Sequence, residues 1–181
     1  SAIHRYDWLE KCRKKALAAG VDFRSKSAGK KALQILDSRP PSMTNAVMLQ
    51  HFSGYEITAN RDVFDSTTAI LMDFRCDQSR GMHFIYCLPF SARNALVEST
   101  LFSPELAPKP FYDSAIRRYL KEIIGIGDYR ITRREKGVIP MATLPQRDPH
   151  LTGFGANGGA IRPSSGYAFS FIQKQIDQII A

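Results

Sequence analysis

The chain has 181 residues, 44% of them hydrophobic, which is enough for one folded domain with a buried core and excludes an intrinsically disordered chain. No apolar stretch approaches the roughly 20 residues that a membrane-spanning helix needs. The formal net charge of +8 suits nucleic acid, an anionic membrane surface or a phosphate-bearing cofactor as partner, and also a basic surface that only faces water.

The cysteines, Cys12, Cys76 and Cys87, are odd in number and form no CxxC motif. We therefore predict reduced thiols in a cytoplasmic protein. The histidines show no metal-ligand spacing, and we predict no metal site. The first residues carry no signal-peptide pattern. Because the sequence lacks an initiator Met, we expect it to be cut from a longer chain.

The first predicted elements are a helix at residues 7–19, capped by Asp7 and ended by Gly20, and a short apolar strand at 32–36. A polar, basic connection at 21–31 separates them. Four strands with short turn-like links follow, which indicates an antiparallel sheet. They are expected at residues 48–57, 68–75, 82–89 and 94–102.

The second half adds a helix at 112–124, a strand at 129–139, a Gly- and Ser-rich stretch at 152–166 and a closing helix at 167–180. The predicted class is α+β, an antiparallel sheet with flanking helices. Residues 1–181 are expected to be a single domain with three parts. These are a helix with a basic connector (1–31), the sheet with its helix (32–141), and a glycine-rich segment with the C-terminal helix (142–181).

Residues 153–158 form a literal GxGxxG. A Rossmann site needs a helix directly after this turn and an acidic residue about 20 positions later that ends a second strand. Pro163 delays the helix, and Asp177 lies inside the last helix, so we reject a Rossmann site here. A glycine-rich loop before a helix can still present backbone N–H groups to a phosphate or a polar ring, or be an ordinary turn.

Strand alternation places Glu98 on one face with Leu96, Thr100 and Phe102. Among apolar neighbours the pKa of a carboxyl group rises, which would make Glu98 a proton donor near neutral pH. Alternatively, this face meets solvent, or an arginine such as Arg75 or Arg93 pairs with the carboxylate.

Two further sets carry both a functional and a structural interpretation. Asp73 and Arg75 share a strand face and form either part of a site or a surface ion pair of little energetic value. The second set is seven aromatic residues. Either they line a long apolar pocket, where their π faces stabilise a cation, or they pack in the core. They are Phe52, Tyr55, Phe64, Phe74, Phe84, Tyr86 and Phe90.

Short motifs run through most of residues 32–172. They are LDSRPP (36–41), QHFSGYE (50–56), LMDFR (71–75), FIYCLPFS (84–91), ALVESTLFS (95–103), EKGVIPM (135–141) and GANGG (155–159), which runs on to RPSSGYAF (162–169). In this order they make the chain resemble the lycopene cyclase family, particularly its bacterial β-cyclases.

The resemblance implies a fold like that of flavin hydroxylases, with a dinucleotide-binding domain and an antiparallel substrate sheet. It implies redox-neutral cyclisation of the ends of lycopene to β-rings. An acidic residue protonates the terminal double bond, the neighbouring alkene attacks the cation, and proton loss closes the ring. FAD has to be reduced, with electrons from NAD(P)H, and stabilises the cationic transition state.

By this resemblance Glu98 is the acid, and plant members carry a second glutamate where this chain has Ser99. Glu135 orients the flavin or substrate or is structural, and Asp73 and Arg75 support the site. The C-terminal segment contacts the flavin. Its matching residues are Gly155, Gly158, Gly159, Pro163, Gly166 and Tyr167, whereas Ala156 stands where the wider flavin class has Asp, which weakens a general monooxygenase interpretation.

The segment that holds the ADP part of the flavin in the family is absent from this sequence, so we expect an internal fragment. The implied partners are lycopene or another apolar polyene and, through the basic clusters, an anionic membrane at its cytoplasmic face. No nucleic-acid-binding motif is present. The alternatives are a related FAD-dependent isoprenoid reductase or monooxygenase, which would consume reductant, and a non-enzymatic carotenoid-binding fragment.

Overall fold

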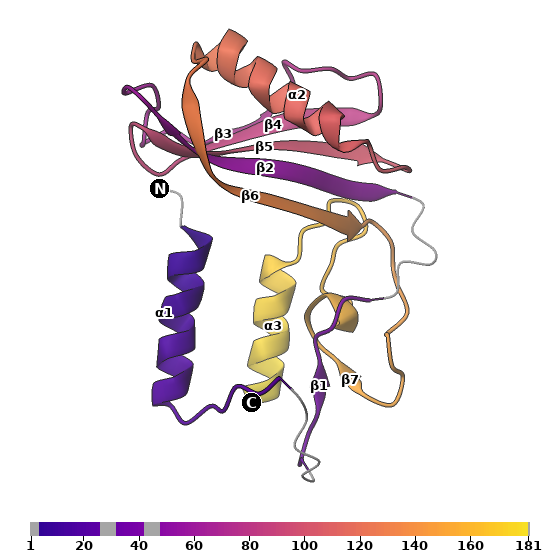
Figure 1. The fold of residues 1–181 in the computed structure, drawn as a ribbon. Helices are drawn as coiled ribbons and strands as arrows, with labels where there is room; N and C mark the ends of the chain where they lie inside the picture. Colours follow the sequence, from indigo (N-terminus) through magenta and orange to yellow (C-terminus); the bar gives the residue numbers. More distant parts are fainter. Residues whose placement is uncertain (1–3, 26–31, 42–47, 181) are drawn as a thin grey trace.

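The computed structural model describes residues 4–25, 32–41 and 48–180. Its body is a five-stranded antiparallel sheet with the strand order β3-β4-β5-β2-β6 (Figure 1). The predicted α+β class with an antiparallel sheet is confirmed. The strands are β2 (Leu49–Ala59), β3 (Ile70–Asp73), β4 (Met82–Pro89), β5 (Asn94–Ser103) and β6 (Tyr129–Pro140).

One face of the sheet is covered by helix α2 (Lys109–Tyr119), which continues as one π-helical stretch (Leu120–Ile124) and ends at Gly125 with φ 78°. Ile116 and Leu120 of this helix are fully buried in the hydrophobic core. The sheet contributes Ile57, Ile85 and Val97 to the same core. Because successive strand residues point to opposite faces, the residues between these core positions face away from α2.

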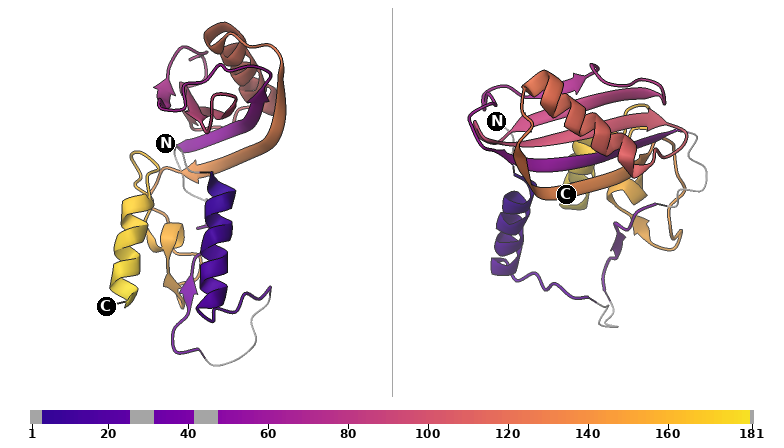
Figure 2. Two further views of the ribbon diagram at one scale, coloured as in Figure 1. Left: turned by 90° about the vertical axis from the view of Figure 1, so that its left-hand side faces the viewer. Right: turned by 45° about the horizontal axis from the view of Figure 1, so that its top comes forward.

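The opposite side of the sheet is flanked by two helices, α1 (Arg5–Ala18) and α3 (Phe169–Ile180), as Figures 1 and 2 show. Beside them lie a short parallel pair, β1 (Leu36–Asp37) with β7 (Thr152–Gly153), and the 3-10 helix η2 (Gly155–Gly158). Neither α1 nor α3 has a buried residue. The core of the molecule therefore lies between the sheet and α2.

Three sequence predictions need correction. The strand expected at 32–36 is wrong in its bounds, because only Leu36 is in a strand, where it pairs with Thr152 of β7. The strand expected at 68–75 shortens to β3, because Met72 has φ 54° and the register with β4 breaks between Ile70 and Asp73. His4, not Asp7, is the N-cap of α1, and Asp7 lies in the first turn, where its charge suits the helix dipole.

Candidate functional site

Glu98 lies in the middle of the sheet face that points away from α2. In the strand register Tyr86 of β4 is opposite Glu98, Gly54 of β2 is its partner on the other side, and Glu135 of β6 lies beyond Gly54. All four therefore lie on one face, in a row that crosses four strands. The sheet brings Glu135 and Glu98, two residues predicted from the sequence, into one site.

The surroundings of Glu98 on this face are apolar and aromatic. Phe84 contacts Tyr86 and Phe102 edge to face, with 5.2 Å and 5.6 Å between ring centroids. Phe52 lies over Gly137 of β6, where an added Cβ would come within 2.5 Å of its ring. The aromatic set predicted as one group is thus divided, since Tyr55 and Phe64 belong to the core beneath α2.

Burial and, to a smaller extent, the nearby Glu135 carboxyl group raise the pKa of Glu98 to about 8. A hydrogen bond of 2.8 Å that the Thr100 hydroxyl donates to Glu98 Oε1 acts in the opposite direction. The folded structure therefore favours the protonated form of Glu98. The alternative pairing with an arginine is wrong, because Arg75 pairs with Asp73 and Arg93 with Asp62.

Asp73 and Arg75 lie on the other side of the sheet from Glu98. The buried Asp73 carboxylate accepts hydrogen bonds from Arg75 and, at 2.9 Å, from the Tyr119 hydroxyl of α2. The hydrogen bonds from Arg75 lower the pKa of Asp73 to about 2. This pair anchors α2 to the sheet edge, and it is more than a surface ion pair because its acid is buried.

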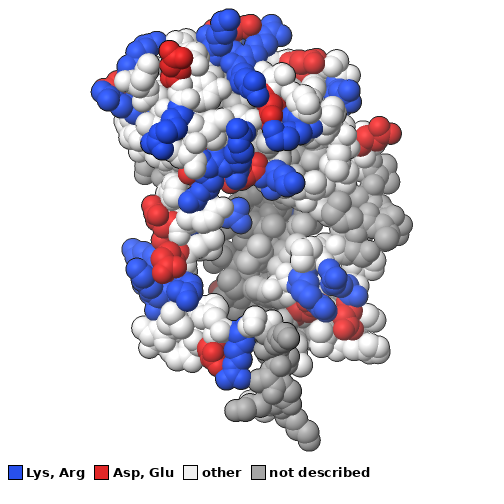
Figure 3. All heavy atoms as spheres, in the orientation of Figure 1, with Lys and Arg blue, Asp and Glu red and all other residues white. Residues whose placement is uncertain are grey.

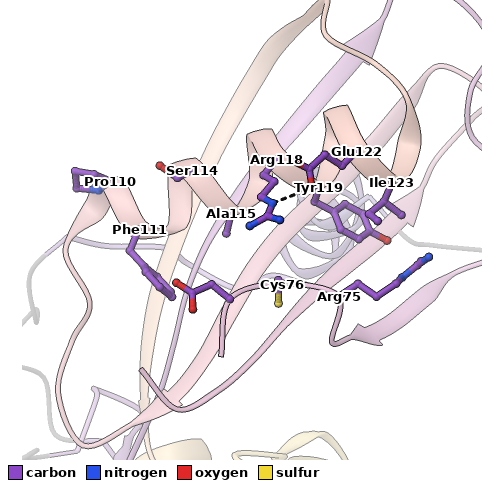
Figure 4. A pocket seen from close by; sticks show the side chains of 11 residues that line it. Arg75, Cys76, Pro110, Phe111, Ser114, Ala115, Arg118, Tyr119, Glu122 and Ile123 are labelled. Carbon is purple, nitrogen blue, oxygen red and sulfur yellow. Dashed lines mark hydrogen bonds and ion pairs between the residues drawn. The ribbon is translucent and has the colours of Figure 1, made fainter. Parts of the chain in front are cut away.

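A cavity of about 380 Å³ lies next to this anchor, between α2 and the segment after β3 (Figure 4). Phe111, Arg118 and Tyr119 line it from the helix side, and Cys76 from the sheet side. Burial raises the pKa of the Cys76 thiol to about 11, so the thiol stays protonated. The cavity is separated from Glu98 by the sheet.

The glycine-rich segment reaches the same face of the sheet as Glu98. Gly166, with φ 69°, lies against Gln50 of β2 and Ile139 of β6, where a side chain would collide with Gln50. Gln50 lies on the Glu98 face of β2, where residue 52 separates it from Gly54. The segment therefore meets the sheet beside the carboxyl site, which the sequence alone could not show.

The six predicted flavin-contact residues differ in what they face. Gly155 and Gly159 have φ values of 63° and 76°, and an added Cβ at either would meet no atom within 4 Å. Gly159 is exposed, so a flat ring could approach its backbone, whereas Gly155 is buried and its N–H donates a 2.8 Å hydrogen bond to Gln175 Oε1. Gly158 instead packs on the backbone of Gly153. Pro163 and Tyr167 are exposed.

The GxGxxG does not open a long helix, in agreement with the rejection of a Rossmann site. It covers Gly153 of the two-residue strand β7 and the 3-10 helix η2, and α3 begins only at Phe169. Within the described residues no group of His, Cys, Asp or Glu is arranged to hold a metal ion. The three cysteines are free.

Comparison with known proteins identifies the family. A family model described as lycopene cyclase protein matches residues 25–181. The chain belongs to the lycopene cyclase family. Lycopene beta-cyclase from Paracoccus sp. is 29% identical over 156 residues, which cover 80% of this chain and 39% of that protein. The chloroplastic lycopene beta cyclase of Arabidopsis thaliana is 36% identical over 132 residues, covering 62% of this chain and 25% of that protein.

This member of the lycopene cyclase family thus spans well under half the length of these curated relatives. Among solved structures, a geranylgeranyl bacteriochlorophyll reductase-like protein from Thermoplasma acidophilum aligns with a TM-score of 0.49 and 14% identity, covering 68% of this chain and 30% of that one. In the part of the chain that the structure describes, every helix is too short or too polar to cross a bilayer.

Proposed function

We propose that this chain is the substrate-facing part of a lycopene beta-cyclase, with Glu98 as the acid that protonates the terminal double bond of lycopene. The observation that carries the proposal is a largely buried carboxyl group without an arginine partner at the centre of an aromatic sheet face, in a chain of the lycopene cyclase family. A carboxylic acid that keeps its proton at neutral pH is what protonation of an alkene requires.

The residues around Glu98 would each support the cyclisation. The partly exposed Phe52 and Tyr86 provide an apolar surface for a polyene end, and their ring faces can stabilise the carbocation that protonation creates, while the buried Phe84 supports Tyr86 from the side. Glu98 forms the new C–H bond with its proton and is left as a carboxylate. The neighbouring alkene then closes the ring, and loss of a ring proton ends the reaction with no net redox change.

Reduced FAD is the cofactor that the family implies, with NAD(P)H as the source of its electrons. The exposed backbone at Gly159 fits the approach of a flat ring, and the exposed Tyr167 lies in the same segment, whereas the buried Gly155 would act only by shaping that segment. When bound, the reduced flavin would supply negative charge that stabilises a cation in a water-poor site. Gly158 and Gly166 would act indirectly, since their own packing shapes the segment.

A membrane-peripheral, cytoplasmic location is also part of the proposal. Lys11, Arg13, Lys14 and Lys15 are exposed on α1, and Trp8 on the same helix is 52% exposed. Figure 3 shows Lys and Arg side chains along α1 and over α2. Such surfaces bind anionic lipid by charge and by aromatic insertion. Sedimentation with vesicles of anionic and of neutral lipid would test it, and equal binding to both would contradict it.

The test of function uses bacteria that accumulate lycopene. The chain is expressed alone and in a chimera in which it replaces the matching segment of the Paracoccus sp. lycopene beta-cyclase. We expect the chimera to form β-rings, detected by chromatography, and its Glu98→Gln variant to form none. Cyclisation by the Glu98→Gln variant would remove Glu98 from the mechanism. Consumption of NAD(P)H in proportion to product would favour the related reductase or monooxygenase instead.

A further inference from the structure

A second carboxyl group lies beside Glu98, with only a glycine between them. Glu98, Gly54 and Glu135 are consecutive partners across β5, β2 and β6. A Cβ added to Gly54 would lie 3.1 Å from Glu135 Cγ and 3.4 Å from Glu135 Oε1. The Glu135 side chain therefore lies across the bare backbone of Gly54, toward Glu98. Any larger residue at position 54 would occupy this path.

The charges around the two carboxyl groups leave them without a counter-ion. Among the described residues the ion pairs on this face belong to Glu56, which contacts His4 at the start of α1 at 3.2 Å and Arg133 at 3.9 Å. The cations next to Glu135 on β6, Arg134 and Lys136, point to the other face by strand alternation, and Arg134 lies 4.3 Å from the Tyr55 ring centroid.

Besides Glu135, the titratable group close to Glu98 on this face is the Tyr86 hydroxyl. Tyr86 of β4 is opposite Glu98, and burial and the Glu98 charge both raise the pKa of its hydroxyl, so it stays neutral. The C-terminal segment meets the face through Gly166 at Gln50 and Ile139, and the Arg162 guanidinium of that segment lies over Phe171 instead.

We propose that Glu98 and Glu135 form a carboxyl pair that shares one proton, in which Glu135 is a positioning residue that keeps this proton on Glu98. The inference rests on the proposed function of Glu98. Two adjacent carboxylates in an apolar site do not both ionise at neutral pH. Glu98 lies on the central strand β5, away from water, whereas Glu135 lies on the edge strand β6, so the proton of the pair is better kept on Glu98.

The pair accounts for both proton steps of a redox-neutral cyclisation. Glu98 gives its proton to the terminal alkene carbon, a C–H bond forms, and the pair then carries two negative charges opposite the carbocation. This charge stabilises the cation in a site of low dielectric constant. After ring closure the C–H bond of the ring carbon breaks, and its proton returns to the pair. No electron or proton is gained or lost overall.

The first test follows the titration of Glu98 in this chain by NMR of ¹³Cδ-labelled glutamate, with the signal assigned by its loss in Glu98→Gln. We expect the midpoint for Glu98 to fall by roughly one pH unit or more in Glu135→Gln, because the repelling charge is gone. The matched control is Glu56→Gln, a carboxyl group on the same face that already has counter-ions, and it should leave the midpoint in place. An unchanged midpoint in Glu135→Gln, or an equal shift in the control, overturns the proposal.

If Glu135→Gln does not fold, Gly54→Val provides the same test with both carboxyl groups retained. Its Cβ would lie 3.1 Å from Glu135 Cγ and 3.2 Å from Leu96 Cδ1, and its two methyl groups extend beyond that contact into the space of the Glu135 side chain. The Glu135 carboxyl group should therefore move away and the Glu98 midpoint should fall, and an unchanged midpoint contradicts the pair. In the Paracoccus chimera the loss of cyclisation with rising pH should begin at lower pH in Glu135→Gln. A wild-type chimera without product would refute the proposed function while the NMR titration still decides on the pair.

Discussion

Glu98 should make the stability of this chain depend on pH in a way that one substitution removes. Burial and Glu135 raise its pKa in the folded state from 4.5 to about 8. The folded state therefore favours the protonated form, and this contribution is fully present below about pH 4.5 and is lost as the pH rises through 8. At 1.36 kcal/mol per pKa unit, a shift of about 3.5 units sets an upper limit of about 5 kcal/mol.

Glu98→Gln keeps the size of the side chain and removes its charge. We expect the free energy of unfolding of the wild type to fall by about 1.4 kcal/mol per pH unit, relative to Glu98→Gln, between about pH 5 and 8. The comparison removes contributions common to both proteins, such as those of the buried His51 and His83, whose pKa values burial lowers. Urea denaturation followed by circular dichroism at several pH values measures this difference.

The control is Glu122→Gln, which removes an exposed carboxylate that pairs with Arg118 on the surface. Its unfolding free energy should follow the wild-type pH dependence closely, because exposed pairs contribute little. Parallel pH profiles for the wild type and Glu98→Gln would refute the reasoning, since they would mean that Glu98 ionises in the folded state as easily as in the unfolded chain.

Three further outcomes follow from the packing. Ile116→Ala should cost about 2–5 kcal/mol in urea denaturation because Ile116 is fully buried, whereas Ile176→Ala on the exposed face of α3 should change stability by less than about 1 kcal/mol. Tyr119→Phe removes the hydroxyl bonded to buried Asp73 and should cost about 1–3 kcal/mol, without moving the NMR titration of Glu98. The contribution of His83 to stability should fall as the pH drops below about 6.5, because burial lowers the pKa of His83 in the folded state, and it is measured as the difference between the wild type and His83→Gln in the same denaturation assay.

Most of the fold could be predicted because its elements carry local signals. Strand-like segments between turn-like links identified β2, β4 and β5, the segment before Pro140 identified β6, and Gly20 follows α1 with φ 84° as expected of a helix terminus. The errors arose where the deciding partner is distant in sequence. Leu36 becomes a strand residue only because it pairs with Thr152, and nothing near residue 36 indicates that pairing.

The site could be predicted only in part, for the same reason. Alternation correctly gave Glu98 an apolar face, but it could not exclude an arginine partner, because the pairing of Arg93 with Asp62 depends on tertiary structure. The register between β2 and β6, which shifts at Glu56/Ile57, decides that Glu135 lies beside Gly54. A glycine in the middle of an apolar strand was the available signal, since it often marks a close approach of another group.

The alternation of strand faces also bears on Ser99, the position at which the family resemblance implies a second glutamate in plant members. In this chain Ser99 is fully buried on the α2 side, where its hydroxyl donates a 2.7 Å hydrogen bond to His83 Nε2, because His83 Nδ1–H donates to the Asp77 carbonyl oxygen. A glutamate there would face His83 and could not join Glu98 across the sheet. The second carboxyl group available to Glu98 therefore comes from β6, through Glu135. A serine at position 99 does not remove an acid from the aromatic face, because position 99 points to the other face.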